Sequence, residues 1–403
     1  MPYKHIIHNL FFITSHYAFL FCPFALARFF VSLHQVKTQT HGFMVLLNSI
    51  PTYIFSSQFP TLRFEQCGYT TINFCVYCAS QKVLDINLTS IATGDQDTDD
   101  VIELYDIGRL FEQNMRQRGL STAYLEIEFG NMVVEDCTVI YCPYHTAMDA
   151  VTFVASRFLT TLSAKRIPTD ATGERLEFIR QDSEYNQVLT LDIKATYQDS
   201  DGYTHYNETL TRSLQSTIRH TMDISPATVL GMLEDKGADV TLVLSYEVSI
   251  GGRSFMYFVD NEAPAMKGFC FRNAFNAEER AYFEAMTVRD TNTERSMATM
   301  HGTSVFYDQQ DSEDFEVTTA PLSYAEAEWL KQMVLSHLVR LHSGDDILIT
   351  DMEEKVSDND TEHKRIKFTY RLARTGASID IGGKATAVTH ARIFTNEFSL
   401  DFS

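Results

Sequence analysis

The sequence predicts a mainly β protein of the α+β class, with helices inserted into two or three antiparallel β-sandwich-like modules. Short runs that alternate apolar and polar residues dominate the chain from Met44 onward, as they do in half-buried strands. The 29 Phe and 19 Tyr suit such pleated surfaces. A helical stretch, a strand, a Gly turn and a returning strand also occur twice in that order, at 106–141 and 207–259. A block used twice favours a protein that builds a shape over one that cradles a single reaction.

Length and charge limit the number of domains and the class of partner. At 403 residues the chain exceeds what one hydrophobic core usually serves, so we expect modules at 44–150, 151–262 and 263–403. The formal net charge of -20 at pH 7 disfavours nucleic acid or an anionic membrane as the main partner. The charge is compatible with a soluble surface that faces solvent or basic partners.

Residues 1–43 differ from the rest because they contain no Asp or Glu. One interpretation is a secretory signal, with an apolar stretch at 10–26 and an A-x-A-like site that ends at Ala27. His16 and Pro23 interrupt that stretch. A second interpretation is an over-extended reading frame with Met44 as the true start. A third is a membrane anchor, for which the uninterrupted apolar run is short.

The first module, 44–150, is expected to hold three strands, a polar loop, a helix and a hairpin. The helix is predicted over 101–118 from apolar residues at helical spacing, and Gly119 stands where a helix-ending Gly belongs. The strands are predicted at 61–64, 70–76 and 83–88, the loop at 93–100 and the hairpin at 123–141.

The second module, 151–262, opens with the apolar segments 157–162 and 176–179. A strand at 188–197 leads to Asp199-Ser200-Asp201-Gly202, which is a hairpin turn signal. Helical stretches are predicted at 207–222 and 225–235, followed by a hairpin at 239–260 around Gly251-Gly252, and 261–264 is expected to be a linker.

The third module, 263–403, breaks the pattern of the first two. A strand at 269–275 leads into 276–286, and further strands are predicted at 304–308, 316–319, 366–373 and 392–402. Ser323 and Glu326 have the spacing of a capping box that begins a helix. Apolar residues then recur on one stripe of that helix, namely Trp329, Leu330, Met333, Val334 and Leu341, together with His337.

Cysteine pairs are the strongest candidates for a metal site. Cys75 and Cys78, with Cys137 and Cys142, would supply the four thiolates of a tetrahedral zinc centre. The second spacing is long, and neither pair lies in a Gly-bearing knuckle. The seven cysteines are also an odd number and do not form a disulfide scaffold at this length. We favour small buried hydrophobes in a reducing compartment.

Other constellations have simpler structural explanations. Asp95, Asp97 and Asp99 resemble the start of a calcium loop, but Asp100 replaces the turn Gly. Cys142 and His145 pair a thiol with an imidazole only in sequence. Ser357-Asp358-Asn359 is best explained as part of a polar turn. His337 and His342 are best explained by a favourable contact with the end of a helix. We therefore predict no enzymatic activity, no catalytic residue, no cofactor and no metal.

Two stretches of the third module resemble a known group of proteins. FCFRNAFNAEERAYFEAMTV (269–288) is similar to a run FRNSFG-x-E-x-x-Y-x-x-G, and ILITDMEEKVSDNDTEHKRIKFTYRLA (347–373) is similar to a run ITD-x-E-x-x-I-S-D-x-D-D-x-L-x-R-x-K-F-T-W-R-x-A. Both runs belong to uncharacterised proteins that Bacteroides prophages encode beside tail genes. The chain departs from them at Phe283-Glu284-Ala285, which lacks the Gly, and at Tyr370, where the group has Trp.

This resemblance implies a structural component of a phage tail or baseplate and assigns no catalytic residue. We expect a virion protein made in the host cytoplasm, acting by assembly with other tail subunits and with copies of itself. The alternative is a secreted or cell-surface bacterial adhesin or carbohydrate-binding protein, which a true signal peptide at 1–27 would favour.

Overall fold

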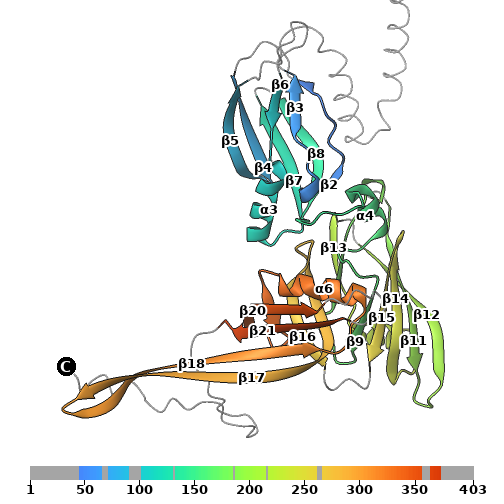
Figure 1. Cartoon of the computed structure of the whole chain (residues 1–403). Coiled ribbons are helices and arrows are strands. Elements are labelled where there is room, and N and C mark those ends of the chain that lie inside the picture. Colours follow the sequence, from blue (N-terminus) through green and yellow to red (C-terminus); the bar gives the residue numbers. More distant parts are fainter. Residues whose placement is uncertain are drawn as a thin grey trace, which may run out of the picture.

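The computed structural model describes residues 45–65, 71–89, 101–129, 132–184, 187–214, 217–260, 266–355 and 364–373. Strands and four α-helices in these ranges confirm the predicted mainly β, α+β class. Three β bodies follow one another along the chain (Figure 1). The leader at 1–43, the loop at 93–100, the linker at 261–264 and the predicted strand at 392–402 lie outside the described residues.

The first body is a sandwich of two sheets that enclose an aromatic core. Its sheets have the strand orders β1-β3-β6 and β2-β8-β7-β4-β5. Phe64 from one sheet contacts Phe74 and Phe129 from the other, with ring centroids 5.1 and 4.9 Å apart. The elements are β1 (Val45–Leu46), β2 (Tyr53–Phe55), η1 (Ser56–Gln58), β3 (Leu62–Glu65), β4 (Thr71–Cys78), β5 (Gln81–Thr89), β6 (Val101–Leu104), α3 (Ile107–Arg118), β7 (Thr122–Phe129) and β8 (Met132–Ile140).

The prediction of a helix over 101–118 is wrong for its first residues, because the helix begins later. Residues 101–104 form β6, which pairs antiparallel with β3, and α3 begins only at Ile107. Ile102 and Leu104 are buried while their neighbours are only partly so, which is the alternation of a strand. Asp106, with φ +57°, separates the two elements. The helix ends as predicted, because Gly119 adopts φ +65° and its N–H bonds the last carbonyls.

The second body is a five-stranded sheet, of order β12-β11-β14-β15-β9, that shares a core with the ribbon β10-β13. Its elements are α4 (Ala150–Ser156), β9 (Ala164–Pro168), β10 (Arg175–Ile179), η2 (Asp182–Glu184), β11 (Thr190–Gln198), β12 (Thr204–Ser213), β13 (Arg219–Asp223), α5 (Pro226–Asp235), β14 (Leu242–Ile250) and β15 (Arg253–Asp260). The segment 157–162 has no regular secondary structure.

The prediction of a helical stretch at 207–222 is wrong, because strands occupy 204–213 and 219–223. The turn at Asp199–Gly202 closes a hairpin as predicted, so the chain returns as β12 beside β11. Residues 219–223 then form β13 on β10. Local turn chemistry and pairing with β11 outweighed the apparent helical spacing. The repeat keeps only its second half, namely helix α5 and the hairpin β14-β15.

The third body is a closed six-stranded barrel, and α6 contacts its β16 and β21. The capping box of Ser323 and Glu326 is confirmed at the start of α6. Trp329, Leu330, Met333 and Val334 are buried, whereas His337 and Leu341 lie beyond the helix. The elements are β16 (Met266–Arg272), β17 (Glu278–Met300), β18 (Thr303–Thr319), α6 (Tyr324–Val334), β19 (Val339–Leu341), β20 (Asp346–Lys355) and β21 (Arg365–Leu372).

Strand pairing stays within the three bodies, but the hydrophobic cores do not. One continuous core runs from the second body into the barrel, from Phe158 to Tyr370. A smaller core joins Phe55 of the first body, Phe153 of α4 and Phe275 of the barrel. The bodies therefore pack on one another through apolar side chains as well as through their connecting segments.

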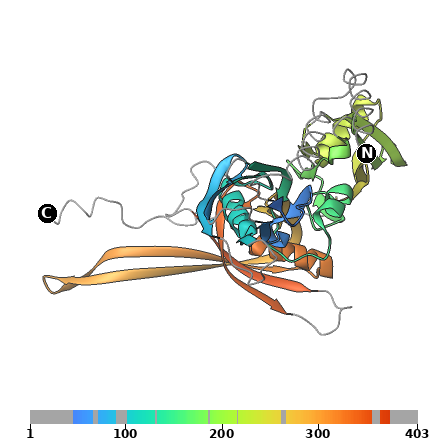
Figure 2. The same ribbon diagram turned by 90° about the horizontal axis from the view of Figure 1, so that it is seen from above.

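Strands β17 and β18 extend far beyond the barrel as a two-stranded arm. Both views show the arm projecting away from all three bodies (Figures 1 and 2). The two strands pair from Ala285 opposite Thr319 to Met300 opposite Thr303, with one register shift between Ser296 and Met297. Sixteen residues of β17 at about 3.3 Å each give this paired ribbon a length of roughly 50 Å.

Candidate functional site

The arm has free edges for most of its length. Strand β17 pairs with β16 only over 278–284, and β18 pairs with β21 only over 315–318. Beyond these points, among the described residues, the outer edge of each arm strand has no hydrogen-bonded neighbour strand. Such edges present rows of unpaired N–H and C=O groups to any strand that approaches them.

One face of the arm is acidic. Residues opposite one another in an antiparallel pair share a face, and alternate residues along a strand do so too. The register pairs Asp290 with Asp314 and Ser296 with Asp308, and Glu294 follows Asp290 by four residues. These four carboxylates therefore lie on one face, which continues the outer surface of the barrel. Asp314 forms an ion pair with Arg371 of β21.

The opposite face of the arm is balanced in charge. Arg289 forms an ion pair with Glu313 and lies over the Phe315 ring, 6.0 Å from its centroid. Arg295 lies 5.5 Å from the centroid of the Phe306 ring. These contacts hold Arg289 and Arg295 on the face opposite Asp290, Glu294 and Asp308.

The tip of the arm carries no Asp, Glu, Lys or Arg between Ser296 and Tyr307. Its turn, His301-Gly302, has positive φ at both residues, as hairpins with the twist of a free ribbon prefer. Met297 and Tyr307 are 65% and 69% exposed, so apolar groups face solvent at the far end of an acidic protein. Exposed apolar groups clustered at one place are typical of a contact surface.

The turn at 273–277 is where all three bodies meet, and it lies within the stretch 269–288. Asn276, with φ +55°, donates from Nδ2 to the carbonyls of Met115 and Leu120 at the end of α3, at 3.0 and 2.9 Å. Asn273 donates to the Leu159 carbonyl of the second body, at 2.7 Å. The turn therefore fixes the first and second bodies to the barrel.

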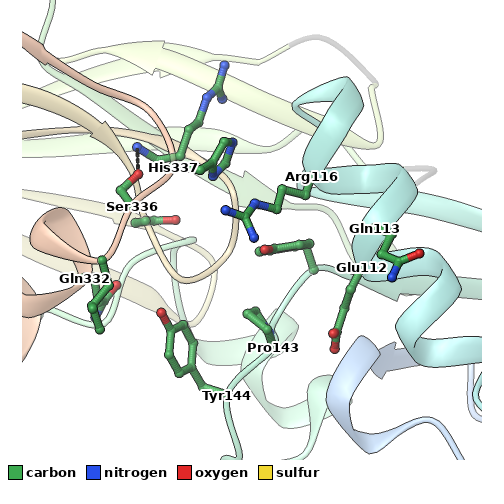
Figure 3. Close-up of a pocket in the computed structure, with 12 residues that line it drawn as sticks. Glu112, Gln113, Arg116, Pro143, Tyr144, Gln332, Ser336 and His337 are labelled. Atoms are coloured by element: carbon green, nitrogen blue, oxygen red, sulfur yellow. Dashed lines mark hydrogen bonds between the residues drawn. The ribbon is translucent and has the colours of Figure 1, made fainter. Parts of the chain in front are cut away.

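A groove of about 220 Å³ opens beside this turn. Side chains reach it from α3, from the segment after β8, from the end of β16 and from α6 with the residues that follow (Figure 3). The lining residues are Glu112, Gln113, Arg116, Tyr141, Pro143, Tyr144, Arg272, Asn273, Gln332, Leu335, Ser336 and His337.

The groove is locally positive. Arg116 points into it, whereas Glu112 points away from Arg116 (Figure 3). Burial, and then the charges of Arg116 and Arg272, lower the pKa of His337 from its usual value. Arg116 and Arg272 line the same groove, although they come from different bodies. Burial raises the pKa of Glu112 from its usual value.

Buried charges elsewhere have structural partners. Lys165 Nζ lies 2.6 Å from Glu174 Oε1, and both side chains are almost fully buried. Arg253, fully buried, bonds Glu184 and the carbonyls of Val154 and Ile179. Burial raises the pKa of Glu174, and the adjacent ammonium of Lys165 opposes that rise. Such pairs hold segments together and give no acid–base couple open to a substrate.

The four candidate zinc cysteines are free thiols in different environments. Cys78 and Cys137 belong to the core of the first body, and Cys142 belongs to the core around Phe55. Burial raises their pKa values, to about 11 for Cys78 and Cys142 and to about 12 for Cys137. Cys75 is buried in β4 outside both clusters. Among the described residues no three His, Cys, Asp or Glu side chains gather as metal ligands.

The remaining sequence candidates are also dispersed. Cys142 is buried and its thiol faces the Tyr144 carbonyl, whereas His145 is exposed. His342 follows β19, and its Nδ1 lies 3.1 Å from Arg280. The acidic run 95–99 and the triplet 357–359 lie outside the described residues.

Sequence reasoning missed Arg116, Arg272, Asn273 and Asn276 as residues that meet in space. Only the FRNAFN text carried a signal, as a resemblance without a role. The groove residues are far apart in the chain, and no spacing rule connects α3 with the end of β16.

Comparisons with known proteins do not assign a family. No protein-family model and no curated protein matches the chain. Two solved structures align with about half of it, described as the calcium binding domain CBD12 of CALX1.1 and CBD12 from CALX1.2. They are 13% and 10% identical, cover 52% and 49% of this chain and 79% and 75% of theirs, and have TM-scores of 0.17 and 0.15. A likeness at that level carries no argument about fold or function. No helix among the described residues is long and apolar enough to cross a membrane.

Proposed function

We propose that the protein is a structural subunit of a phage tail or baseplate, and that it acts by assembly with further copies through the β17-β18 arm. The observation that carries this proposal is the arm itself, with its free edges, its acidic face and its uncharged tip. The prophage context comes from the sequence resemblance at 269–288 and 347–373.

The physics of an isolated ribbon supports an assembly role. A two-stranded hairpin alone is marginally stable in water. An arm of this length would be held better when a neighbouring surface covers one face or edge. Its base is anchored in a closed barrel, so the arm projects from a body that lacks open sheet edges of its own. Charged side chains along the shaft limit indiscriminate edge pairing.

Sedimentation velocity over a range of concentrations tests the proposal. The variant replaces residues 290–314 with Asn-Gly, so that the paired residues Arg289 and Phe315 flank a two-residue turn. We expect the full chain to associate and the variant to remain monomeric with an unchanged melting temperature. A full chain that stays monomeric at every concentration would overturn assembly of this protein with itself.

Immunogold labelling of induced particles tests the phage assignment separately. Label on tails or baseplates is the expected result. Mature protein that begins after Ala27 and is found at the bacterial surface would instead establish the adhesin alternative.

A further inference from the structure

The groove between the first body and the barrel is lined by two arginines, Arg116 and Arg272, and by one carboxylate, Glu112, which points away from Arg116 (Figure 3). Arg116 is exposed, and among the described residues no carboxylate lies within ion-pair distance of it. The Arg272 guanidinium donates to the Asn276 carbonyl, at 3.1 Å, and it forms no ion pair with a carboxylate of the described residues. Two arginines, one from α3 and one from the end of β16, therefore line an open groove in a protein whose net charge is -20. Planar guanidinium groups bind carboxylates in paired, directional hydrogen bonds.

The arm has the complementary chemistry. Three carboxylates on its outer face have no cationic partner among the described residues, namely Asp290, Glu294 and Asp308. All three are exposed, and the basic side chains Arg289 and Arg295 are held on the opposite face. The arm thus presents a row of exposed carboxylates along one face, away from the three bodies.

We propose that the groove receives carboxylate side chains from the acidic face of the arm of a second copy of this chain. This inference rests on the proposed function, because it names the surface on which the arm lands. Glu294 and Asp308 are the residues we assign to the contact, and Arg116 is their main partner. Tyr144 lines the same groove and adds a phenol hydroxyl.

The contact has a definite symmetry. Arm and groove are different surfaces of the same chain, so each copy would use both, one toward each neighbour. Such head-to-tail contacts generate a ring when the rotation between neighbours closes, and a filament when it does not. The interface would join subunits in one direction, unlike a two-fold dimer.

Charge reversal in the full chain tests this contact by sedimentation velocity. Arg116→Glu should weaken association at least about tenfold, because one close charge pair is lost and a repulsive pair replaces it. The double change Glu294→Lys and Asp308→Lys should weaken it to a similar extent. Combining the groove and arm changes should restore association most of the way to wild type. Arg212→Glu, an exposed substitution on β12 with the same change in charge, is the matched control and should associate normally.

The outcomes separate this inference from the broader proposal. If Arg116→Glu associates like wild type while removal of residues 290–314 abolishes association, the groove is not the receptor, although the arm still assembles the protein. If groove and arm reversals each weaken association but their combination does not rescue it, the two surfaces do not meet and the inference fails. If inorganic phosphate binds the groove without affecting association, the groove serves a free oxyanion and the inference also fails. Association that persists without residues 290–314 overturns the proposed function itself.

Discussion

Asn276 allows the strength of the three-body junction to be measured directly. Its side-chain amide donates to two carbonyls at the end of α3, and its backbone adopts φ +55°. Each of these two hydrogen bonds contributes about 1 kcal/mol net to stability. The Met115 carbonyl also accepts from the Leu120 N–H, so it keeps one partner when the Asn276 amide is removed. Asn and Gly both tolerate a left-handed backbone, whereas Ala pays about 1 kcal/mol for it. We therefore expect Asn276→Ala to lower the free energy of unfolding by about 3 kcal/mol.

Two further substitutions separate these contributions. Asn276→Gly removes the two hydrogen bonds but not the tolerance for positive φ, and should cost about 2 kcal/mol. Asn276→Asp keeps much of that tolerance but turns a donor into a charged acceptor facing two carbonyls. It should be the most destabilising of the three.

Urea unfolding followed by Trp329 fluorescence and by circular dichroism provides the assay. Trp329 is the single Trp, and its ring contacts Phe271, two residues before the junction turn, with centroids 5.8 Å apart. Equal losses for Ala and Gly would refute the contribution from backbone strain. Losses below about 0.5 kcal/mol for both would refute the claim that these bonds hold the first body to the barrel.

Three other expectations concern single positions. Gly108→Ala should destabilise by about 2–3 kcal/mol, because a Cβ would lie 2.1 Å from the Ser56 carbonyl oxygen. Gly231→Ala, in the open on α5, should raise the melting temperature, and equal effects at the two sites would contradict the packing argument. Ser323→Ala should cost about 1 kcal/mol in urea unfolding through loss of the capping box, and Ser323→Asp should retain most of that stability. Burial and then Arg180 lower the pKa of His220, so below its usual value of 6.5 the unfolded chain binds a proton that the folded protein does not. Stability should therefore fall as pH drops through 6.5, and a His220→Phe variant that keeps the same slope would assign the effect to another group.

Local signals predicted much of the fold correctly. The pair Ser323 and Glu326 located the start of α6, Gly119 located the end of α3, and the turn at 199–202 located a hairpin. Each depends on neighbours within a few residues. The errors at 101–104 and 207–222 arose where apolar spacing fitted a helix and a strand almost equally well, and pairing with β3 and β11 decided the outcome.

The candidate sites were beyond reach for a different reason. Strands at 304–308 and 316–319 were expected, and both belong to β18. The alternating pattern of a strand is the same whether the strand lies in a barrel or projects from one. Nothing local shows that β16 and β21 stop pairing where they do. The groove likewise depends on bringing Arg116 next to Arg272, which are separated by more of the chain than any spacing rule spans.

The way the arm enters the barrel determines how it would respond to mechanical force. Its two strands are continuous with barrel strands, and each is paired antiparallel to a fixed neighbour, from Met266 opposite Glu284 to Arg272 opposite Glu278 and from Phe315 opposite Tyr370 to Thr318 opposite Lys367. A pull along the arm acts parallel to these strands, so it shears the ladders and the hydrogen bonds resist together. A sideways pull would instead open the bonds one at a time. The pairing therefore lets the arm transmit tension along its own axis into the barrel.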